Sequence, residues 1–290
     1  MSYELQLFLD EQAIAFEQGT FPDGAVWLRI TQRVPDSARL MRIRARAMRD
    51  MNDLMLLAQL VDAVTHVCDV SFRHLELPWL PYARQDRHLC AGDSFALRVF
   101  AQYLNAIGFD RVLVLDPHSE AAAAAVNNLV AVPQQRCVLQ HPALREGLRS
   151  GQLLAVAPDA GALKKFHEVV QASGAGEYAT MTKQRDVKTG ALSGFALLSG
   201  EVAGRDVLIV DDICDGGGTF IGAANVLRQA GARSVALYVT HGLFSKGIAP
   251  LLDGGIDVIY TTTSLTSPGL QHPQVRLIDI DAIYHQRSER

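Results

Sequence analysis

The stretch DVLIVDDICDGGGT, residues 206–219, decides the fold of this chain. Four consecutive apolar residues, 207–210, predict a buried parallel strand, and Asp211 and Asp212 come where that strand is expected to end. Three glycines and a threonine follow, and an apolar face of helical period then runs as far as Gly231, which predicts the end of a helix. A second apolar run, 235–239, completes a predicted strand–helix–strand unit.

The loop between this strand and this helix suits an anion. Glycines let backbone N–H groups turn inward, and a helix N-terminus adds partial positive charge. Asp211 and Asp212 are acceptors, which suit sugar hydroxyls or a metal ion rather than phosphate. A ribose 5-phosphate group, with a phosphate at one end and a diol nearby, meets both requirements. A glycine-rich turn without a ligand is the simpler interpretation, and a third carboxylate inside the loop, Asp215, weakens it.

Composition is that of a globular protein. The 290 residues are 49% hydrophobic and 20% charged, and the length allows two domains. A net charge of −4 argues against a general nucleic-acid binder, and no apolar stretch is long enough to predict a membrane span. The N-terminal residues lack a signal-peptide pattern, and four scattered cysteines predict free thiols in a reducing compartment, the cytoplasm.

The first half of the chain alternates between strand and helix patterns. Strands are expected at 5–9, 26–30 and 112–115, and helices at 52–64 and 95–107. The segment 39–49 contains five arginines, and in part of it apolar residues and arginines alternate with a period of two. Either a half-solvated strand or an anion site would account for these arginines, and the period favours the strand.

A polar loop, YARQDR at 82–87, follows another predicted strand. In an open α/β sheet, ligands bind at the carboxyl ends of the strands. Arg84 is a forked donor suited to phosphate oxygens, and Gln85 offers both a donor and an acceptor. If this loop stood alone, a surface loop without function would explain it equally well.

The loop belongs to a series of blocks: YARQDR, GFDRVLVLDPHSE (108–120), APDAG (157–161), the stretch 211–219 and THGLFSKG (240–247). In this order, and over most of the chain, they resemble the ribose-phosphate diphosphokinase family, the synthetases of phosphoribosyl diphosphate (PRPP). The resemblance implies that this chain is a divergent, short member of that family. The stretch 211–219 resembles the PRPP loop DD-x-x-D-T-G-G-T that this family shares with phosphoribosyltransferases. Gly216 stands where the family usually has Thr, so one hydroxyl contact to phosphate is lost there.

The resemblance implies an α/β fold of two phosphoribosyltransferase-like domains, each a mostly parallel sheet flanked by helices. Residues 1–145 would form the ATP side and residues 146–290 would carry the PRPP loop, with the active site between them. The implied reaction is Mg²⁺-dependent transfer of the diphosphoryl group of ATP to the C1 hydroxyl of ribose 5-phosphate, giving PRPP and AMP. The family also implies a homo-oligomer, although five alanines, 121–125, replace the run that it associates with subunit contacts and effector response.

The resemblance assigns catalytic and metal residues as well. Lys183 and Arg185 have the spacing of the family's catalytic pair, within a polar segment (181–194) that composition predicts to be a mobile loop or β-flap. His118 matches the family's histidine beside Mg-ATP, and it would organise metal and phosphates together with Asp159. Imidazole is an unusual ligand for Mg²⁺, so the histidine contact is expected to be indirect or to phosphate. Asp159 also fits a helix N-cap.

The binding residues follow in the same way. Arg84 and Gln85 would hold ATP, while Phe21 and Asp23 match residues that reach the adenine of a neighbouring subunit. Ala25 replaces a glutamate expected there, so the nucleotide preference does not follow from the sequence. The sugar phosphate would be held by Asp211, Asp212, Asp215, Gly216, Gly217, Gly218 and Thr219.

Three other functions remain compatible with these motifs. A catalytically weak, synthetase-like regulatory subunit would bind substrates and form little PRPP. A PRPP-consuming phosphoribosyltransferase would release diphosphate from PRPP and a base without ATP. A non-enzymatic nucleotide sensor would bind ATP without turnover.

Overall fold

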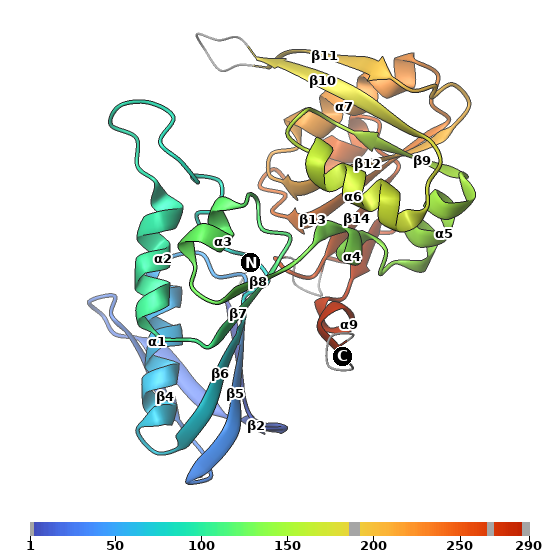
Figure 1. The fold of residues 1–290 in the computed structure, drawn as a ribbon. Helices are drawn as coiled ribbons and strands as arrows, with labels where there is room; N and C mark the ends of the chain where they lie inside the picture. The colour runs from blue at the N-terminus through green and yellow to red at the C-terminus, as the bar shows by residue number, and fades with distance from the viewer. Residues whose placement is uncertain (1–2, 186–191, 266–269, 286–290) are drawn as a thin grey trace. The chain divides into compact units, whose positions relative to one another are not determined.

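The computed structural model describes residues 3–185, 192–265 and 270–285, and the side chains at 184, 185, 192, 193 and 285 lie outside this description. The chain divides into two compact units, Met1–Val132 and Pro133–Arg290 (Figure 1). The sequence analysis placed the domain boundary between 145 and 146. The short helix α4 (Gln134–Val138) lies before that point and α5 (Pro142–Ser150) spans it, and both belong to the second unit.

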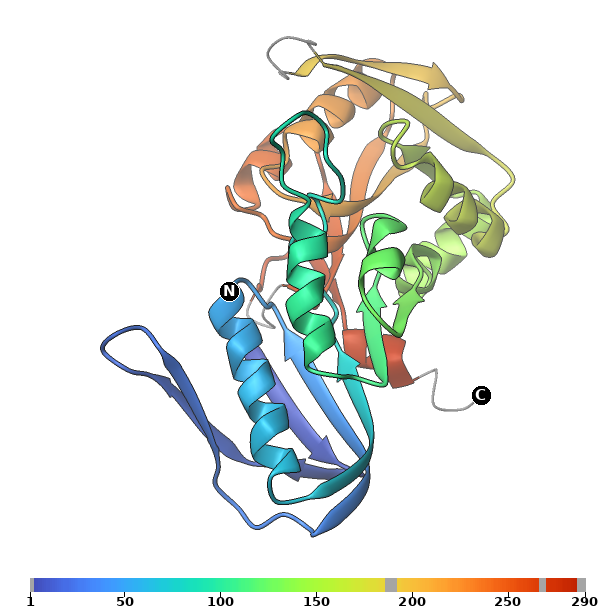
Figure 2. The same cartoon turned by 60° about the vertical axis from the view of Figure 1, so that its left-hand side comes forward.

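A six-stranded sheet in the order β2-β1-β5-β6-β7-β8 forms the body of the first unit. Strands β5 to β8 run parallel, and β1 and β2 add an antiparallel edge. Helices α1 and α2 lie on one face of this sheet (Figures 1 and 2), and β3 and β4 form a separate hairpin. The elements are β1 Glu4–Leu9, β2 Gln12–Ile14, β3 Phe16–Thr20, β4 Val26–Ile30, β5 Ser37–Arg46, α1 Met51–Thr65, β6 Asp69–Glu76, α2 Ala96–Ala106, β7 Arg111–Leu115, α3 Ala121–Ala125 and β8 Leu129–Val132.

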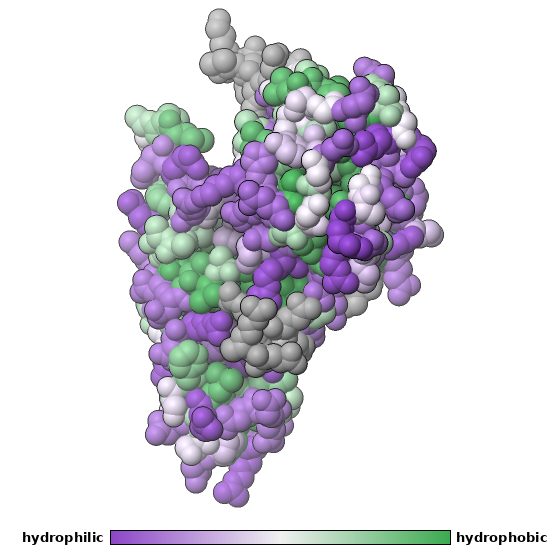
Figure 3. Space-filling view, turned by 45° about the vertical axis from the view of Figure 1, so that its right-hand side comes forward, coloured by the Kyte–Doolittle hydropathy of each residue, from purple (hydrophilic) through white to green (hydrophobic). Residues whose placement is uncertain are grey.

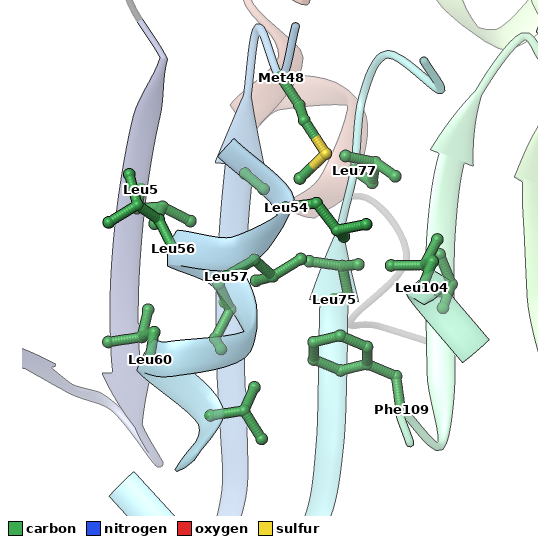
Figure 4. Packing of buried hydrophobic residues seen from close by; sticks show 14 of the residues in the cluster. Leu5, Met48, Leu54, Leu56, Leu57, Leu60, Leu75, Leu77, Leu104 and Phe109 are labelled. Carbon is green, nitrogen blue, oxygen red and sulfur yellow. The ribbon is translucent and has the colours of Figure 1, made fainter. Parts of the chain in front are cut away.

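The core of the first unit lies between the sheet and these two helices. The period of two in β5 places Met41, Ile43 and Ala45 on the helix side, where each is fully buried. Leu57 and Leu60 of α1 pack into the same apolar cluster, shown in Figure 4. This packing holds the strands at fixed register, so the loops at their carboxyl ends start from a rigid frame.

Arg42, Arg44 and Arg46 of β5 lie on the opposite face of the sheet and contact carboxylates. Arg44 is buried and its Nε donates to Glu76 Oε2 at 2.6 Å, while Arg42 Nη1 lies 3.6 Å from the same oxygen. The guanidinium of Arg42 also stacks 3.9 Å from the ring centroid of Phe8. Three of the four arginines in this strand therefore have partners within the unit, while Arg39, near its start, is exposed.

The second unit contains a seven-stranded sheet in the order β11-β10-β9-β12-β13-β14-β15. Strands β9 to β15 pair in parallel, apart from the antiparallel edge strand β11. The fold class predicted from the sequence, mostly parallel sheets flanked by helices, is thereby confirmed. Besides α4 and α5, the elements are β9 Leu153–Ala157, α6 Leu163–Ser173, β10 Tyr178–Arg185, β11 Leu192–Ser199, β12 Asp206–Cys214, α7 Gly218–Gln229, β13 Ser234–Gly242, α8 Ala249–Asp253, β14 Val258–Thr262, β15 Val275–Ile278 and α9 Ile280–His285.

Helices cover both faces of this second sheet (Figures 1 and 2). Ala223, Ala224 and Leu227 of α7 pack against the face that carries Val207 and Ile209. On the other face, α6 contacts α4 and α5, while α5 and α6 contact β9 and α4 contacts β13. Strand β12 lies between two parallel neighbours and is buried on both sides, as its continuous apolar run predicts.

One strand boundary differs from the sequence prediction. Asp211 and Asp212 lie inside β12, which continues to Cys214, and not at its end. The pairing of β12 with β9 stops at Ile209, but its pairing with β13 extends to Cys214. Asp211 and Asp212 therefore lie on a stretch of β12 that pairs with β13 alone, because the pairing with β9 has already ended.

The prediction of free thiols agrees with the structure. All four cysteines are free. Within the described ranges, no helix combines the length and the apolar character that a membrane span requires. Hydrophilic residues cover much of the face drawn in Figure 3, with smaller apolar patches between them.

Candidate functional site

The glycine-rich loop after β12 has a conformation that depends on one glycine. Gly217 has a φ of +80°, and a Cβ at this position would lie 2.7 Å from Leu251 Cδ2. A side chain here would meet both a strained backbone and a collision. The carbonyl of Gly217 then accepts from the N–H groups of Phe220 and Ile221, which starts α7. The glycine thus fixes the turn that leads from the strand into the helix.

The backbone of this loop presents unused donors. The N–H groups of residues 216 to 219 donate no hydrogen bond to any other part of the described chain. They stand at the N-terminus of α7, a helix of 12 residues. Successive N–H groups at such a terminus form a cradle for an anion, because their dipoles point the same way and each lacks an acceptor.

Next to the loop, the two carboxylates of β12 lie in different environments. Asp212 is buried, and its Oδ2 accepts from Lys165 Nζ at 3.1 Å. Asp211 accepts the Asp212 N–H at 2.9 Å. Burial raises the pKa of Asp211 well above its usual range, and the neighbouring charges of Asp212 and Asp159 raise this pKa further. The site therefore holds acceptors for hydroxyl groups in a partly desolvated position.

Asp159, in the loop after β9, contacts both backbone and side-chain donors. Its Oδ1 accepts from the N–H groups of Gly161 and Ala162 ahead of α6, at 2.9 and 3.2 Å. Its Oδ2 accepts from Lys183 Nζ of β10 at 2.6 Å, with both side chains less than one fifth exposed. The N-cap of α6 is Ala162, so Asp159 closes the turn ahead of the helix instead of capping it, and the same carboxylate holds Lys183.

These residues can accommodate Mg²⁺ in the way this ion commonly binds. The described residues contain no group of three or more His, Cys, Asp and Glu side chains placed to hold a metal ion. Mg²⁺ usually takes one or two carboxylates and completes its octahedron with water and substrate phosphates. The carboxylate of Asp159 fits that pattern if the metal ion takes the place of the Lys183 ammonium at its Oδ2.

The cysteine of this segment is not a nucleophile. Burial raises the pKa of the Cys214 thiol to about 12, and the nearby carboxylates of Asp215 and Asp211 contribute to the rise. A thiol of this kind stays protonated at neutral pH and packs as an apolar group.

In the first unit, the YARQDR loop and the turn after β7 meet at Asp86. The Arg87 guanidinium donates to Asp86 at 2.8 and 2.9 Å and lowers the pKa of this carboxyl to about 2. Burial opposes this effect, while the charge of the nearby His118 adds to it. His118 therefore lies near the loop that carries Arg84 and Gln85. The N–H of Gln85 donates to Tyr82 and its carbonyl accepts from Leu97, which ties the loop to α2.

Phe21 and Asp23 lie at the tip of the β3–β4 hairpin, and their contacts among the described residues are with this hairpin. Phe21 is 53% exposed, and its ring centroid is 6.3 Å from that of Trp27. Asp23 accepts the N–H of Ala25 at 3.0 Å. The structure thus shows an aromatic pair of an exposed Phe21 and a half-buried Trp27, of which the sequence analysis named only Phe21.

Two further points separate the sequence from the structure. Lys183 lies on a β-flap, since β10 and β11 pair antiparallel, but the side chain of Arg185 falls outside the described residues. Lys165 was not named as a site residue, although it contacts Asp212. The two residues are 47 positions apart, and their contact follows from the way α6 packs beside β12, which no local pattern reveals.

Known proteins provide a comparison for this geometry. The ribose-phosphate pyrophosphokinase of Vibrio cholerae is 31% identical over 251 residues, which cover 85% of this chain and 77% of that relative. This chain belongs to the ribose-phosphate pyrophosphokinase family. The enzyme of the same name from Maricaulis maris is 29% identical over 289 residues, covering 97% of this chain and 89% of the relative.

Other comparisons agree with this family assignment. The family model described as phosphoribosyl synthetase-associated domain matches residues 191–288. The crystal structure of phosphoribosylpyrophosphate synthetase from Mycobacterium smegmatis superposes with a TM-score of 0.79 at 23% identity, over 97% of this chain and 93% of that one. This likeness shows the fold of the pyrophosphokinase family along nearly the whole chain.

Proposed function

We propose that this member of the family is a ribose-phosphate diphosphokinase, which transfers the diphosphoryl group of ATP to the C1 hydroxyl of ribose 5-phosphate. The products are PRPP and AMP. The observation that carries the proposal is the arrangement at the end of β12: four unused N–H groups, at 216 to 219, follow two carboxylates on the same strand. This pairing suits a phosphate and a diol on one ligand.

The second unit binds ribose 5-phosphate in this proposal. The N–H groups of the loop hold the 5-phosphate, and Asp211 and Asp212 accept hydrogen bonds from ribose hydroxyls. Lys165 keeps Asp212 oriented through its 3.1 Å contact. Asp215, Gly218 and Thr219 complete the loop around the phosphate.

Charge on the diphosphoryl group is the main chemical problem of the transfer. The C1 hydroxyl oxygen attacks the β-phosphorus of ATP and its proton is released to solvent. The bond from this phosphorus to the α,β-bridging oxygen breaks, and AMP leaves with the electron pair. Lys183 supplies positive charge to the transferring group, and Arg185 is proposed as its partner on the flap. A bound Mg²⁺ would neutralise part of the phosphate charge, with Asp159 as its protein ligand.

The first unit binds the nucleotide in this proposal. Arg84 and Gln85 contact ATP phosphates and base, and His118 holds phosphate beside them. Their proximity is supported by Asp86, which interacts with both Arg87 and the turn at 118–119. Phe21 and Asp23 are proposed to reach adenine, Phe21 through its exposed ring. A homo-oligomer and a cytoplasmic location remain predictions from the sequence.

The decisive experiment measures AMP and PRPP released from ribose 5-phosphate, ATP and Mg²⁺, with GTP and CTP in parallel reactions. Equal amounts of AMP and PRPP are expected, and EDTA should abolish both. The comparison among nucleotides tests the effect of Ala25 on donor preference.

Other outcomes would assign a different function. Binding of ribose 5-phosphate or ATP without product would indicate a regulatory subunit or, for ATP alone, a sensor. Release of diphosphate from PRPP and a base in the absence of ATP would indicate a phosphoribosyltransferase.

A further inference from the structure

A lysine outside the predicted site lies across the phosphate loop. A Cβ placed on Gly216 would lie 3.5 Å from Lys246 Cε and 3.6 Å from its Cδ. The stem of Lys246 therefore runs over the one position of the loop where the sequence has lost a hydroxyl side chain. Its ammonium group is one bond beyond Cε, on a flexible stem that passes over this glycine.

The turn that carries Lys246 is fastened to the loop. The carbonyl of Cys214 accepts from the N–H groups of Leu243 and Phe244 at 2.9 and 3.1 Å, and the carbonyl of Asp215 accepts from Ser245 at 3.3 Å. Gly247 then donates to Phe244 at 2.8 Å, which closes a four-residue turn with Lys246 at its third position. The backbone of Lys246 is thus held in register with the backbone of the loop.

The ammonium of Lys246 is available for a ligand. This residue is exposed, and no hydrogen bond or ion pair links it to any described residue. Each of the other lysine contacts at this edge, Lys165 with Asp212 and Lys183 with Asp159, is with a carboxylate. The Lys246 ammonium can therefore add a full positive charge to the phosphate loop, where the N–H groups of residues 216–219 offer only backbone dipoles.

We infer that Lys246 binds the 5-phosphate of the sugar substrate and takes the place of the hydroxyl contact that Gly216 lacks. This inference rests on the proposed function, because it assigns a further binding residue to the same ribose 5-phosphate site. The stem of Lys246 passes over Gly216, where the absence of a side chain leaves room for it. The remaining N–H groups orient the phosphate, and Lys246 adds affinity through its charge.

The test compares the native chain with Lys246→Met, which keeps a similar stem length and removes the charge. The Michaelis constant for ribose 5-phosphate is expected to rise about 10- to 100-fold, the usual worth of a charge-assisted hydrogen bond. The turnover number and the Michaelis constant for ATP should change little. Calorimetric binding should show the same loss for ribose 5-phosphate and no change for ribose, which lacks the phosphate.

Two further variants exclude a general effect of charge or folding. Arg149→Met removes an exposed cation from α5, which precedes β9 and so lies at the opposite edge of the sheet, and it should leave both constants unchanged. Gly216→Thr should be accommodated, since a Cβ there makes ordinary contacts, and in the Lys246→Met background it should recover part of the lost affinity.

The outcomes separate this inference from the proposed function. If the native enzyme forms PRPP and Lys246→Met has an unchanged constant for ribose 5-phosphate, the inference is wrong and the function stands. If the native chain neither binds nor consumes ribose 5-phosphate, the proposed function fails and the inference fails with it.

Discussion

The ends of β7 and β12 show how two similar strands can lead to different chemistry. Each is an apolar strand within a mostly parallel sheet, and each brings a buried aspartate, Asp116 or Asp212, to the carboxyl end. After β12, the chain forms a glycine loop and a helix of 12 residues. After β7, a turn containing His118 leads to α3, which has 5 residues.

This difference indicates that the strand and the following loop have separate roles. The strand positions an acid at the sheet edge in both units, because burial of the apolar run fixes its place. The loop then decides what can bind. The second unit presents backbone N–H groups for a phosphate, while the first unit offers the side chains Arg84, Gln85 and His118, which suit a nucleotide. The predictions below test this division, beginning with the largest effect.

Loss of the flap cation should have the largest effect. Lys183→Ala is expected to lower turnover by about 10³-fold or more, because charge stabilisation of the transferring group is lost. Ribose 5-phosphate should still bind, since the loop at 216–219 is intact. Steady-state release of AMP and PRPP, together with calorimetric binding, measures both quantities. Turnover close to the native value would remove Lys183 from the mechanism.

A substitution in the turn after β7 should affect the nucleotide side of the reaction. His118→Ala is expected to reduce turnover about 100-fold, with a rise in the Michaelis constant for ATP and little change for ribose 5-phosphate. His66→Ala, at an exposed position after α1, serves as the control. A selective effect on ribose 5-phosphate would contradict the division between the two strand ends.

The neighbouring glycines of the loop provide a matched pair. Gly217→Ala should weaken ribose 5-phosphate binding about tenfold or more, because the alanine would occupy a backbone with φ of +80° and collide with Leu251. Gly216→Ala should change binding about twofold at most, since its Cβ would make ordinary contacts with Lys246. Equal effects of the two alanines would show that the conformation of Gly217 does not support the cradle.

The smallest effect concerns stability of the first unit. The folded pKa of Asp86, about 2, is below the usual 3.8, so this carboxylate stabilises the fold above pH 4 and loses that contribution as the pH falls towards 2. Asp86→Asn should lower the free energy of unfolding by about 1 kcal/mol at pH 7, less than the full shift implies because Arg87 is exposed. The deficit should shrink between pH 4 and pH 2.

Tryptophan fluorescence during urea unfolding can measure the stability difference caused by Asp86→Asn. It reports on the unit that contains Asp86, because both tryptophans, Trp27 and Trp79, belong to the first unit. A deficit that stays constant down to pH 2 would mean that the Asp86 carboxylate is not the stabilising group.

The sequence alone determined the family, the fold class and most element positions. This was possible because apolar runs, glycines and motif order are local features: the run at 207–210 predicts a buried strand, and Gly217 predicts a turn that needs a positive φ. The same local logic placed Asp159, Asp211 and Asp212 near ligand-binding edges. It misjudged the end of β12, because the ladder continues on one side only, with β13 as the partner.

The tertiary structure decided which charged groups meet. The contacts of Lys183 with Asp159, of Lys165 with Asp212 and of Lys246 with the surface over Gly216 join residues that are 24 or more positions apart. Each depends on how a helix, a flap or a turn packs beside β9 or β12. The sequence does not show which group a lysine contacts. Its long, flexible side chain can reach several positions, and the packing of the sheet decides which carboxylate or ligand lies within its range.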